Sequence, residues 1–299
     1  MNFPISADNI SKTFGRKPVL AGLTLEVPEN GIYGLIGPNG AGKTTAIKIV
    51  MNILRPTSGR AYVLGTNSMH LSPKDLACIG YVAADQQLPG WMTLEMLLAY
   101  LKPFYPTWDD SYAAELVRDF DLPLTRKIAN LSHGMRMKTA LACSLAYRPR
   151  VLLLDEPFTG LDPLVRDELI GGILASGEHA TILISSHDLN DIETFVSHVG
   201  YLDKGRLRFS EEMSVVTSRF REVQVLIDGA TPAPGSWPAA WLNIEQSDHM
   251  VRYVDTNFDR QRTLADIRRI FGDATRVETK AMPLRSIFVT LAKSARREA

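Results

Sequence analysis

Cysteine is scarce in this chain, and long apolar runs are missing. Only two of the 299 residues are cysteines, Cys78 and Cys143, and no CxxC pair occurs. This gives no sign of a disulfide framework or a zinc site and fits a reducing compartment, so we expect both thiols to pack in the core. The apolar runs fall well short of the roughly 20 residues that a membrane-spanning helix needs. Residues 1–11 lack a basic segment followed by an apolar core, so we expect no secretory signal.

An excess of charge of one sign is also missing. The 33 Lys and Arg residues balance 33 Asp and Glu residues, so the formal net charge is zero. A neutral chain gives no reason to expect general binding to nucleic acid, and we expect no nucleic-acid partner. The hydrophobic share of 45% and the charged share of 22% are ordinary for a globular protein, and the length suits one large and one small domain.

The first part of the chain, residues 1–212, alternates short apolar segments with helical patterns. Near-continuous apolar segments predict strands of a parallel sheet that is covered on both faces, at residues 32–36, 80–82, 151–155 and 181–185. A helix is expected over residues 43–51, and a closing hairpin over residues 201–209. A helical subdomain is expected at about residues 90–147, with Thr107 as a helix cap and Asp109 and Asp110 in the first turn.

The character of the chain changes near residues 210–217, and we expect a second domain over residues 213–299. Strands are expected at residues 222–227, 250–254 and 276–280, and helices at residues 264–271 and 284–292. Residues 230–241 are rich in Pro, Ala and Trp and are expected to form a loop. This pattern is typical of a small α+β domain.

One loop fits the pattern G-x-x-x-x-G-K-[ST] in full. It consists of Gly37, Pro38, Asn39, Gly40, Ala41, Gly42, Lys43 and Thr44. An expected buried strand precedes it and an expected helix follows it, so backbone N–H groups and the positive end of the helix dipole can surround a phosphate. Lys43 is expected to reach the β- and γ-phosphates, and the Thr44 hydroxyl to bind Mg²⁺. The sequence therefore predicts a site for Mg²⁺-ATP; the alternative is a glycine turn without function.

Two acids, Asp155 and Glu156, end the apolar strand at residues 151–155. Ligands bind at the carboxyl ends of parallel strands. Asp155 there can hold Mg²⁺ through water, and Glu156 can orient or deprotonate an attacking water. Alone, such a pair is equally consistent with a helix-capping acid. Beside the phosphate loop, the pair predicts hydrolysis of ATP.

Two further polar residues lie where expected elements begin or end. Ser132 is expected to cap a helix, whose first N–H groups then form an anion site. His187 follows the strand at residues 181–185, at the sheet edge that also holds Lys43 and Glu156, where it can contact a γ-phosphate. Each has a plain alternative, a simple helix cap for Ser132 and a structural histidine for His187.

Five strings occur in order along the chain: GPNGAGKTT, LS-x-G, LLLDEP, GLDP and SSHDL. Their order and spacing resemble the nucleotide-binding subunit of ABC transporters, over about residues 4–210. Residues 81–106 and 283–289 look like the ABC-2 type branch of that family. The resemblance implies an α/β fold: a P-loop NTPase cassette with a mixed sheet, an antiparallel β subdomain and a helical subdomain. A small C-terminal accessory domain would follow.

The resemblance also implies a dimer. Each ATP would lie between the phosphate loop of one copy and the turn of Ser132, His133 and Gly134 of the other copy. Asp162 would link the two sites. The implied partners are a second copy and a transmembrane permease, and the implied place is the cytoplasmic face of the cell membrane, with export as the direction of transport.

Further site residues follow from the same resemblance. Phe14 would stack on adenine, unless it packs in the core of the first sheet, and Thr45 would extend the phosphate site. Glu156 would polarise the attacking water, and His187 would hold the γ-phosphate and that water.

Two positions depart from the family pattern. His133 stands where glycine is usual, and we expect it still to permit the ATP sandwich. Ala84 stands where Gln or Glu usually senses Mg²⁺ and water, so either Asp85 or Gln86 takes this role or no residue does.

Three bulky apolar residues, Leu88, Trp91 and Met92, precede the helical region. They either pack in the core or line the cleft that receives a helix of the membrane partner. Two other classes of function fit the sequence less well. A soluble cassette ATPase acting on ribosomes or DNA is disfavoured by the single cassette and the zero net charge. A regulatory ATP-binding module without hydrolysis is disfavoured by the acids and histidine at the site.

Overall fold

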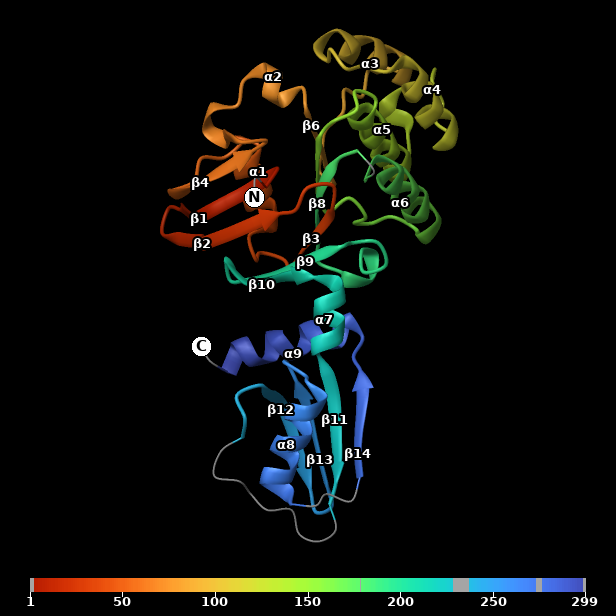
Figure 1. The fold of residues 1–299 in the computed structure, drawn as a ribbon. Helices are drawn as coiled ribbons and strands as arrows, with labels where there is room; N and C mark the ends of the chain where they lie inside the picture. The colour runs from red at the N-terminus through yellow and green to blue at the C-terminus, as the bar shows by residue number, and fades with distance from the viewer. Residues whose placement is uncertain (1–2, 178, 228–236, 273–275, 298–299) are drawn as a thin grey trace. The chain divides into compact units, whose positions relative to one another are not determined.

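A computed structural model describes residues 3–177, 179–227, 237–272 and 276–297. The chain divides into two compact units, residues 1–210 and 211–299 (Figure 1). Among the described residues, no helix has the length and apolar character that crossing a membrane would require. Cys143 is buried as expected, whereas Cys78 is half-exposed, because it lies in the surface connection that leads into the central sheet.

Six strands form the central sheet of the first unit, in the order β10-β9-β3-β8-β7-β6 (Figure 1). The bounds of these strands are β3 Ile32–Ile36, β6 Ile79–Ala83, β7 Val151–Asp155, β8 Thr181–Ser186, β9 His198–Asp203 and β10 Arg206–Glu212. The strands β9, β3, β8, β7 and β6 pair in parallel. All residues of β3, β7 and β8 are buried, which confirms the parallel sheet predicted from continuous apolar runs. The carboxyl ends of β3, β7 and β8 therefore share one edge.

A second sheet is antiparallel and has the order β2-β1-β4-β5. Its elements are β1 Ile5–Phe14, β2 Lys17–Val27, β4 Ser58–Val63 and β5 Thr66–Asn67, followed by η1 Ser68–His70 and α2 Pro73–Leu76. Helix α1 (Lys43–Val50) follows β3, and its apolar side belongs to one buried cluster with side chains of both sheets. This packing fixes the loop between β3 and α1 against two sheets.

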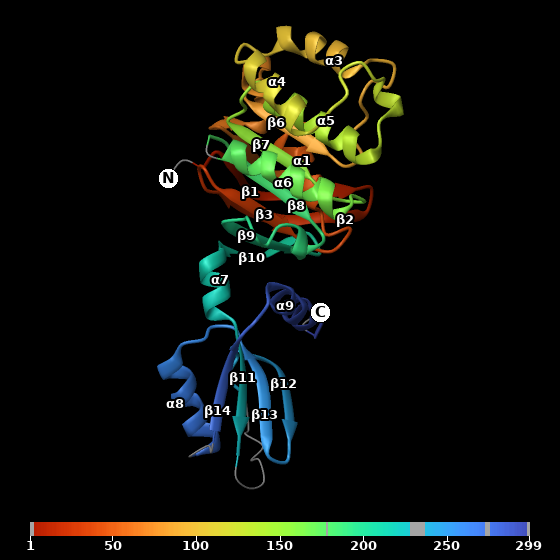
Figure 2. The ribbon, with the colours of Figure 1, turned by 90° about the vertical axis from the view of Figure 1, so that its right-hand side faces the viewer.

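Helices form the region after β6, as Figure 2 shows for α3, α4 and α5. The bounds are α3 Leu94–Leu101, η2 Lys102–Phe104, α4 Asp110–Asp119, η3 Ile128–Asn130 and α5 His133–Leu145. The mixed sheet, the antiparallel sheet and these helices confirm the predicted fold class. The predicted cap of α4 is wrong: Asp109 accepts the backbone N–H of Tyr112 at 3.0 Å, whereas the Thr107 hydroxyl donates to the carbonyl of Tyr147 at 2.5 Å. A tertiary partner 40 residues away thus takes the Thr107 hydroxyl out of capping.

Two elements connect the remaining strands at the shared edge. Helix α6 (Pro163–Gly177) joins β7 to β8, and the short helix η4 (Leu189–Asp191) follows β8. Asp162 caps α6, since its carboxylate accepts the N–H of Val165 at 3.1 Å, as expected for Asp-Pro at a helix start.

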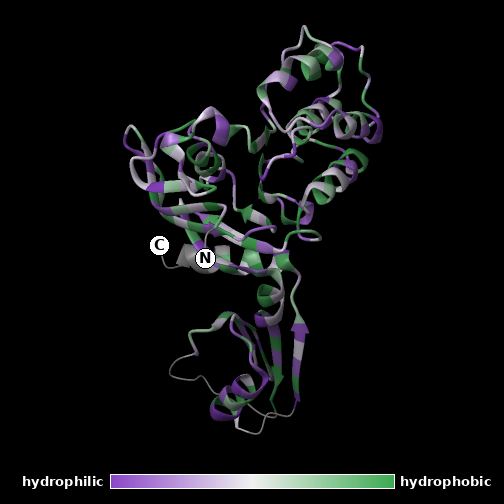
Figure 3. Cartoon of the chain, turned by 45° about the horizontal axis from the view of Figure 1, so that its top comes forward, coloured by the Kyte–Doolittle hydropathy of each residue, from purple (hydrophilic) through white to green (hydrophobic). Residues whose placement is uncertain are grey.

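The second unit contains a four-stranded antiparallel sheet in the order β12-β13-β11-β14. Its elements are α7 Met213–Arg219, β11 Arg221–Leu226, β12 Trp241–Ser247, β13 Met250–Asp255, α8 Arg260–Phe271, β14 Arg276–Ala281 and α9 Leu284–Arg297. Strand β11 contains both hydrophilic and hydrophobic residues (Figure 3). Its buried Val223 and Val225 belong to one cluster with side chains of α8 and with Trp241, whose ring stacks 3.7 Å from that of Tyr253.

The sequence missed β12. The expected loop at residues 230–241 falls largely on residues 228–236, outside the described part, but Trp241 begins a strand. A register shift between Leu242 and Glu245 breaks the alternation of this strand, and Asn243 has a φ of 50°. A bulged strand gives no clean period of two, which is why the pattern did not reveal it.

Candidate functional site

The phosphate loop leads from β3 directly into α1. Gly40 and Gly42 have φ values of 81° and 110°, which other residues rarely adopt. A Cβ on Gly37 would lie 2.1 Å from the carbonyl oxygen of Leu202, so the loop passes too close to β9 for any side chain there. Glycine is therefore required by backbone conformation at two positions and by close approach at a third.

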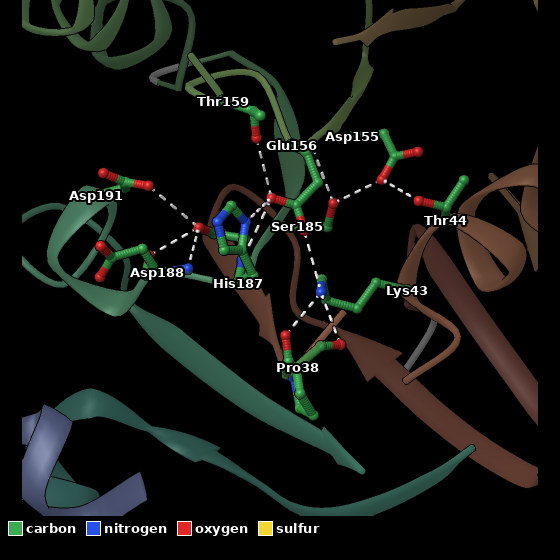
Figure 4. Close-up of polar contacts among 12 residues, drawn as sticks. Pro38, Lys43, Thr44, Asp155, Glu156, Thr159, Ser185, His187, Asp188 and Asp191 are labelled. Carbon is green, nitrogen blue, oxygen red and sulfur yellow. Dashed lines mark hydrogen bonds and ion pairs between the residues drawn. The ribbon is translucent and has the colours of Figure 1, made fainter. Parts of the chain in front are cut away.

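Lys43 is buried beneath the loop, with a relative exposure of 5%. Its ammonium donates to the carbonyls of Gly37 at 2.7 Å and Pro38 at 3.3 Å, and lies 3.0 Å from Oε1 of Glu156 (Figure 4). A buried ammonium needs such partners because desolvation disfavours the charge. The lysine thus joins the loop to the end of β7.

Asp155 and Thr44 meet at the carboxyl end of β7. The Thr44 hydroxyl donates to Oδ1 of Asp155 at 3.0 Å, and the Ser185 hydroxyl donates to the same oxygen at 2.7 Å (Figure 4). Burial raises the pKa of Asp155, although these two hydrogen bonds oppose the effect. A buried carboxylate beside a hydroxyl is a fitting donor pair for a hard cation.

A magnesium ion at this place would share its ligands with a phosphate group. Among the described residues, no cluster of three or more His, Cys, Asp or Glu side chains is arranged to hold a metal. Mg²⁺ usually keeps several waters and is bound by one or two protein groups plus substrate phosphates. Thr44 and Asp155 fit that requirement.

Glu156 contacts Lys43, His187 and Thr159. It follows β7 with a φ of 54°; its Oε2 lies 2.6 Å from Nδ1 of His187 and also accepts the backbone N–H of His187 at 3.3 Å and the hydroxyl of Thr159 at 3.4 Å (Figure 4). Burial alone would raise the pKa of Glu156, but the hydrogen bond from His187 and the charge of Lys43 together lower it. Glu156 is therefore ionised at neutral pH and has a fixed orientation.

These side chains line one open pocket. Its lining comprises Lys17, Pro18, Val19, Asn39, Gly40, Gly42, Lys43, Thr44, Thr45, Ala84, Glu156, Thr159 and His187. The structure thus brings together the phosphate loop, Glu156 and His187 as the sequence predicts. The sequence analysis did not identify Thr159 or the hydrogen-bonding role of Ser185. Thr159 lies three residues after Glu156, and Ser185 ends an expected strand, so their positions in the sequence could have indicated both.

The turn of Ser132, His133 and Gly134 lies at the start of α5. The Ser132 hydroxyl accepts the N–H of Met135 at 3.2 Å and so caps the helix as predicted. Among the described residues of the pocket, none comes from this turn. Gly134 packs against α6, since a Cβ there would lie 2.9 Å from a methyl group of Val165. His133 donates from Nε2 to the carbonyl of Thr159 over 3.0 Å.

Phe14 lies outside the core, with a relative exposure of 47%, so the alternative that places it in the core of the first sheet is wrong. The ammonium of Lys12 lies 5.0 Å from the centroid of its ring, and Phe14 pairs across the β1–β2 turn with Lys17, which lines the pocket. Stacking on adenine stays a prediction.

The structure does not bring Asp85 or Gln86 into the pocket; Ala84 lines it instead. The Gln86 side chain turns back and accepts the N–H of Ala83 at 3.3 Å. That Asp85 or Gln86 senses Mg²⁺ and water in place of the usual Gln or Glu stays a prediction.

Leu88, Trp91 and Met92 do not form one surface. Trp91 is 65% exposed, Leu88 is half-buried and Met92 is only 8% exposed. Of the two alternatives, core packing is confirmed for Met92 and a partner contact is wrong for it, because the turn that leads into α3 points this side chain into the protein. Trp91 is free to meet another molecule.

Comparisons with known proteins agree with this geometry. A family model described as ABC transporter matches residues 20–159. The ABC transporter ATP-binding protein YtrB of Bacillus subtilis is 30% identical over 226 residues, 75% of this chain and 77% of that protein. The daunorubicin resistance ATP-binding protein DrrA2 of Streptomyces coeruleorubidus is 36% identical over 213 residues, 68% of this chain and 65% of that protein. A solved structure of an ATP-binding subunit of an ABC transporter has a TM-score of 0.66 and 26% identity, and the match covers 72% of this chain and 92% of that one.

The pocket, the motif order and these matches agree: the chain belongs to the family of ABC transporter ATP-binding proteins, in the ABC-2 type branch, and it binds and hydrolyses ATP to power transport.

Proposed function

We propose that two copies of this chain close around two ATP molecules and that this closure drives a transmembrane permease. The observation that carries the proposal is the separation of the two halves of the site: the pocket holds Lys43 and Glu156, while the turn at Ser132 adds none of its described residues. Ser132 is exposed at a helix N-terminus, where an anion is favoured. A second copy would complete the pocket with this turn.

Within one copy, the contacts suggest a task for each side chain. Lys43 would leave its ion pair with Glu156 and contact the β- and γ-phosphates instead. Thr44 and Asp155 would hold Mg²⁺, which when bound neutralises phosphate charge. Glu156 would accept the proton of the attacking water, and His187 would orient Glu156 and contact the γ-phosphate. The ion pair of Lys43 and the hydrogen bonds at Glu156 support these roles.

The remaining roles concern binding and closure. We assign Phe14 to adenine stacking, because its exposed ring lies next to the strand that lines the pocket. The N–H groups of the loop from Gly37 to Thr45 would surround the phosphates. Asp162, which caps α6 beside the Ser132 turn, would pass the state of one site to the other.

A gel-filtration experiment with light scattering tests the closure. The Glu156→Gln variant should double its mass when Mg²⁺-ATP is added, because ATP stays bound and bridges two copies. The matched control is Ser132→Arg in the same background, which should remain monomeric because a bulky cation fills the turn. A strict monomer of Glu156→Gln at saturating ATP would sink the proposal, including the expectation that His133 permits the sandwich.

The permease contact is proposed to involve Trp91. Its ring is 65% exposed next to the helical region, and large exposed aromatic rings are common anchors at interfaces. The chain would then work at the cytoplasmic face of the cell membrane. The names of relatives such as the daunorubicin resistance protein favour export as the direction.

Replacing Trp91 by alanine should weaken co-purification with the permease by tenfold or more, as expected for an interface anchor worth about 2 kcal/mol. Hydrolysis by the isolated chain should not change, because Trp91 is not among the residues that line the pocket. Ile53→Ala is the control, since Ile53 is similarly exposed at 53% in another part of the unit. Equal loss of hydrolysis and co-purification would instead make Trp91 a folding residue.

A further inference from the structure

His133 makes a contact that a glycine could not make. Its Nε2 lies 3.0 Å from the carbonyl oxygen of Thr159, and the ring also covers Gly160, where a Cβ would sit 3.8 Å from two ring atoms. A carbonyl oxygen only accepts hydrogen bonds, so Nε2 must carry the hydrogen. The first residue of α5 is thereby tied to the loop that follows Glu156.

Thr159 continues this connection to the carboxylate. Its backbone N–H donates to the carbonyl of Glu156 at 3.2 Å, and its hydroxyl donates to Oε2 of Glu156 at 3.4 Å. Thr159 also lines the ATP pocket. Two steps, His133 to Thr159 and Thr159 to Glu156, therefore connect the turn at α5 with the base of the same copy.

The elements around this contact also have caps and packing of their own. The start of α5 is already capped by Ser132 and packed through Gly134 on Val165, and Asp162 caps α6 independently. The His133 ring is half-exposed. Its hydrogen bond thus adds little to the core and acts mainly on the position of Thr159.

We propose that His133 is a positioning residue: through Thr159 it holds Glu156 in the orientation needed for hydrolysis in its own pocket. The inference rests on the proposed roles of Glu156 and of the Ser132 turn. Since that turn would meet the ATP of the second copy, arrival of this ATP moves or fixes the His133 ring and so changes Glu156 of the first copy.

Steady-state hydrolysis by the full chain tests the positioning role. In His133→Ala, kcat should fall about fivefold with an unchanged KM for ATP, the effect of one lost hydrogen bond. His133→Gln should recover most of the rate, because its side-chain amide can donate to the same carbonyl. His70→Ala is the control, since His70 is exposed in the unrelated helix η1.

Thr159→Val removes the second step of the connection. When it is combined with His133→Ala, the loss should not exceed that of the larger single change, because both act along one path. An unchanged kcat in His133→Ala, a raised KM with unchanged kcat, or no recovery in His133→Gln would each overturn the proposal. The raised KM would mean that His133 only contacts the ATP of the second copy.

A second measurement requires neither hydrolysis nor a dimer. In the nucleotide-free chain, ¹⁵N spectra of the histidine rings should show a hydrogen on Nε2 of His133. A hydrogen on Nδ1 and none on Nε2 would overturn the contact itself. If the wild-type chain fails to hydrolyse ATP, or if Glu156→Gln fails to dimerise, the proposed function fails while this spectrum still reports on the contact.

Discussion

Replacing Glu156 by glutamine should lower ATP hydrolysis by roughly 10²- to 10⁴-fold, the range for loss of a general base. The same change should tighten ATP binding, because the carboxylate that pairs with Lys43 at 3.0 Å competes with phosphate for that ammonium. Rapid-mix assays of phosphate release and a fluorescent-nucleotide titration measure the two effects. Glu115→Gln, an exposed change on α4, is the control.

The pH dependence of the wild type follows from the direction of the shift at Glu156. Its pKa is lowered by His187 and Lys43 against the effect of burial. The ionised form therefore persists as pH falls, and both hydrolysis and the stability contributed by this group should be lost only below the usual range of a glutamate. Loss of activity centred above that range, with no change in binding, would contradict the role of Glu156 as the base.

Replacing Asp155 by asparagine should have opposite effects on activity and stability. Hydrolysis should fall at least about a hundredfold, since the cation is worth several kcal/mol to the reaction. The nucleotide-free chain should melt about 2–4 °C higher, as expected for a gain of about 1 kcal/mol in a domain of this size. Asparagine keeps the oxygen that accepts from Thr44 and Ser185 but removes the buried charge.

The sign of this stability change depends on pH. Burial raises the pKa of Asp155, so the ionised carboxylate reduces stability at neutral pH, and this cost disappears as pH falls through the raised pKa. The gain in the Asn variant should therefore vanish in acid. Asp109→Asn is a matched control of opposite sign, because hydrogen bonds from Ser111, Tyr112 and Arg148 lower the pKa of Asp109 to about 2. A melting temperature of Asp155→Asn that does not rise at neutral pH would contradict the argument.

Much of the site could be predicted from the sequence, because its residue types and spacings are local features. The spacing of glycines, Lys43 and Thr44 specifies a loop whose backbone conformation needs those residue types, and the runs of buried residues in β7 and β8 specify parallel strands. In a parallel sheet the ends of such strands share one edge, so Asp155, Glu156 and His187 were expected together. The structure places Glu156 against both Lys43 and His187, and Asp155 beside Thr44.

Other features depend on partners that are distant in sequence. Thr107 and Asp109 are both good capping residues, and the choice between them was decided by the carbonyl of Tyr147. Trp91 and Met92 are adjacent and both apolar, yet one is exposed and the other buried. Local pattern cannot separate such cases, because both residues satisfy the same local preference.

The sequence by itself determined the chemistry of the pocket, since a phosphate loop and two acids at strand ends are defined by residue type and spacing. Only the tertiary structure decided how that pocket connects to its surroundings. The contact of His133 with Thr159 spans 26 residues and joins the start of α5 to the loop that precedes α6. Whether these two segments meet depends on how α5 and α6 pack. That packing is a property of the whole unit, so no single motif could have specified it.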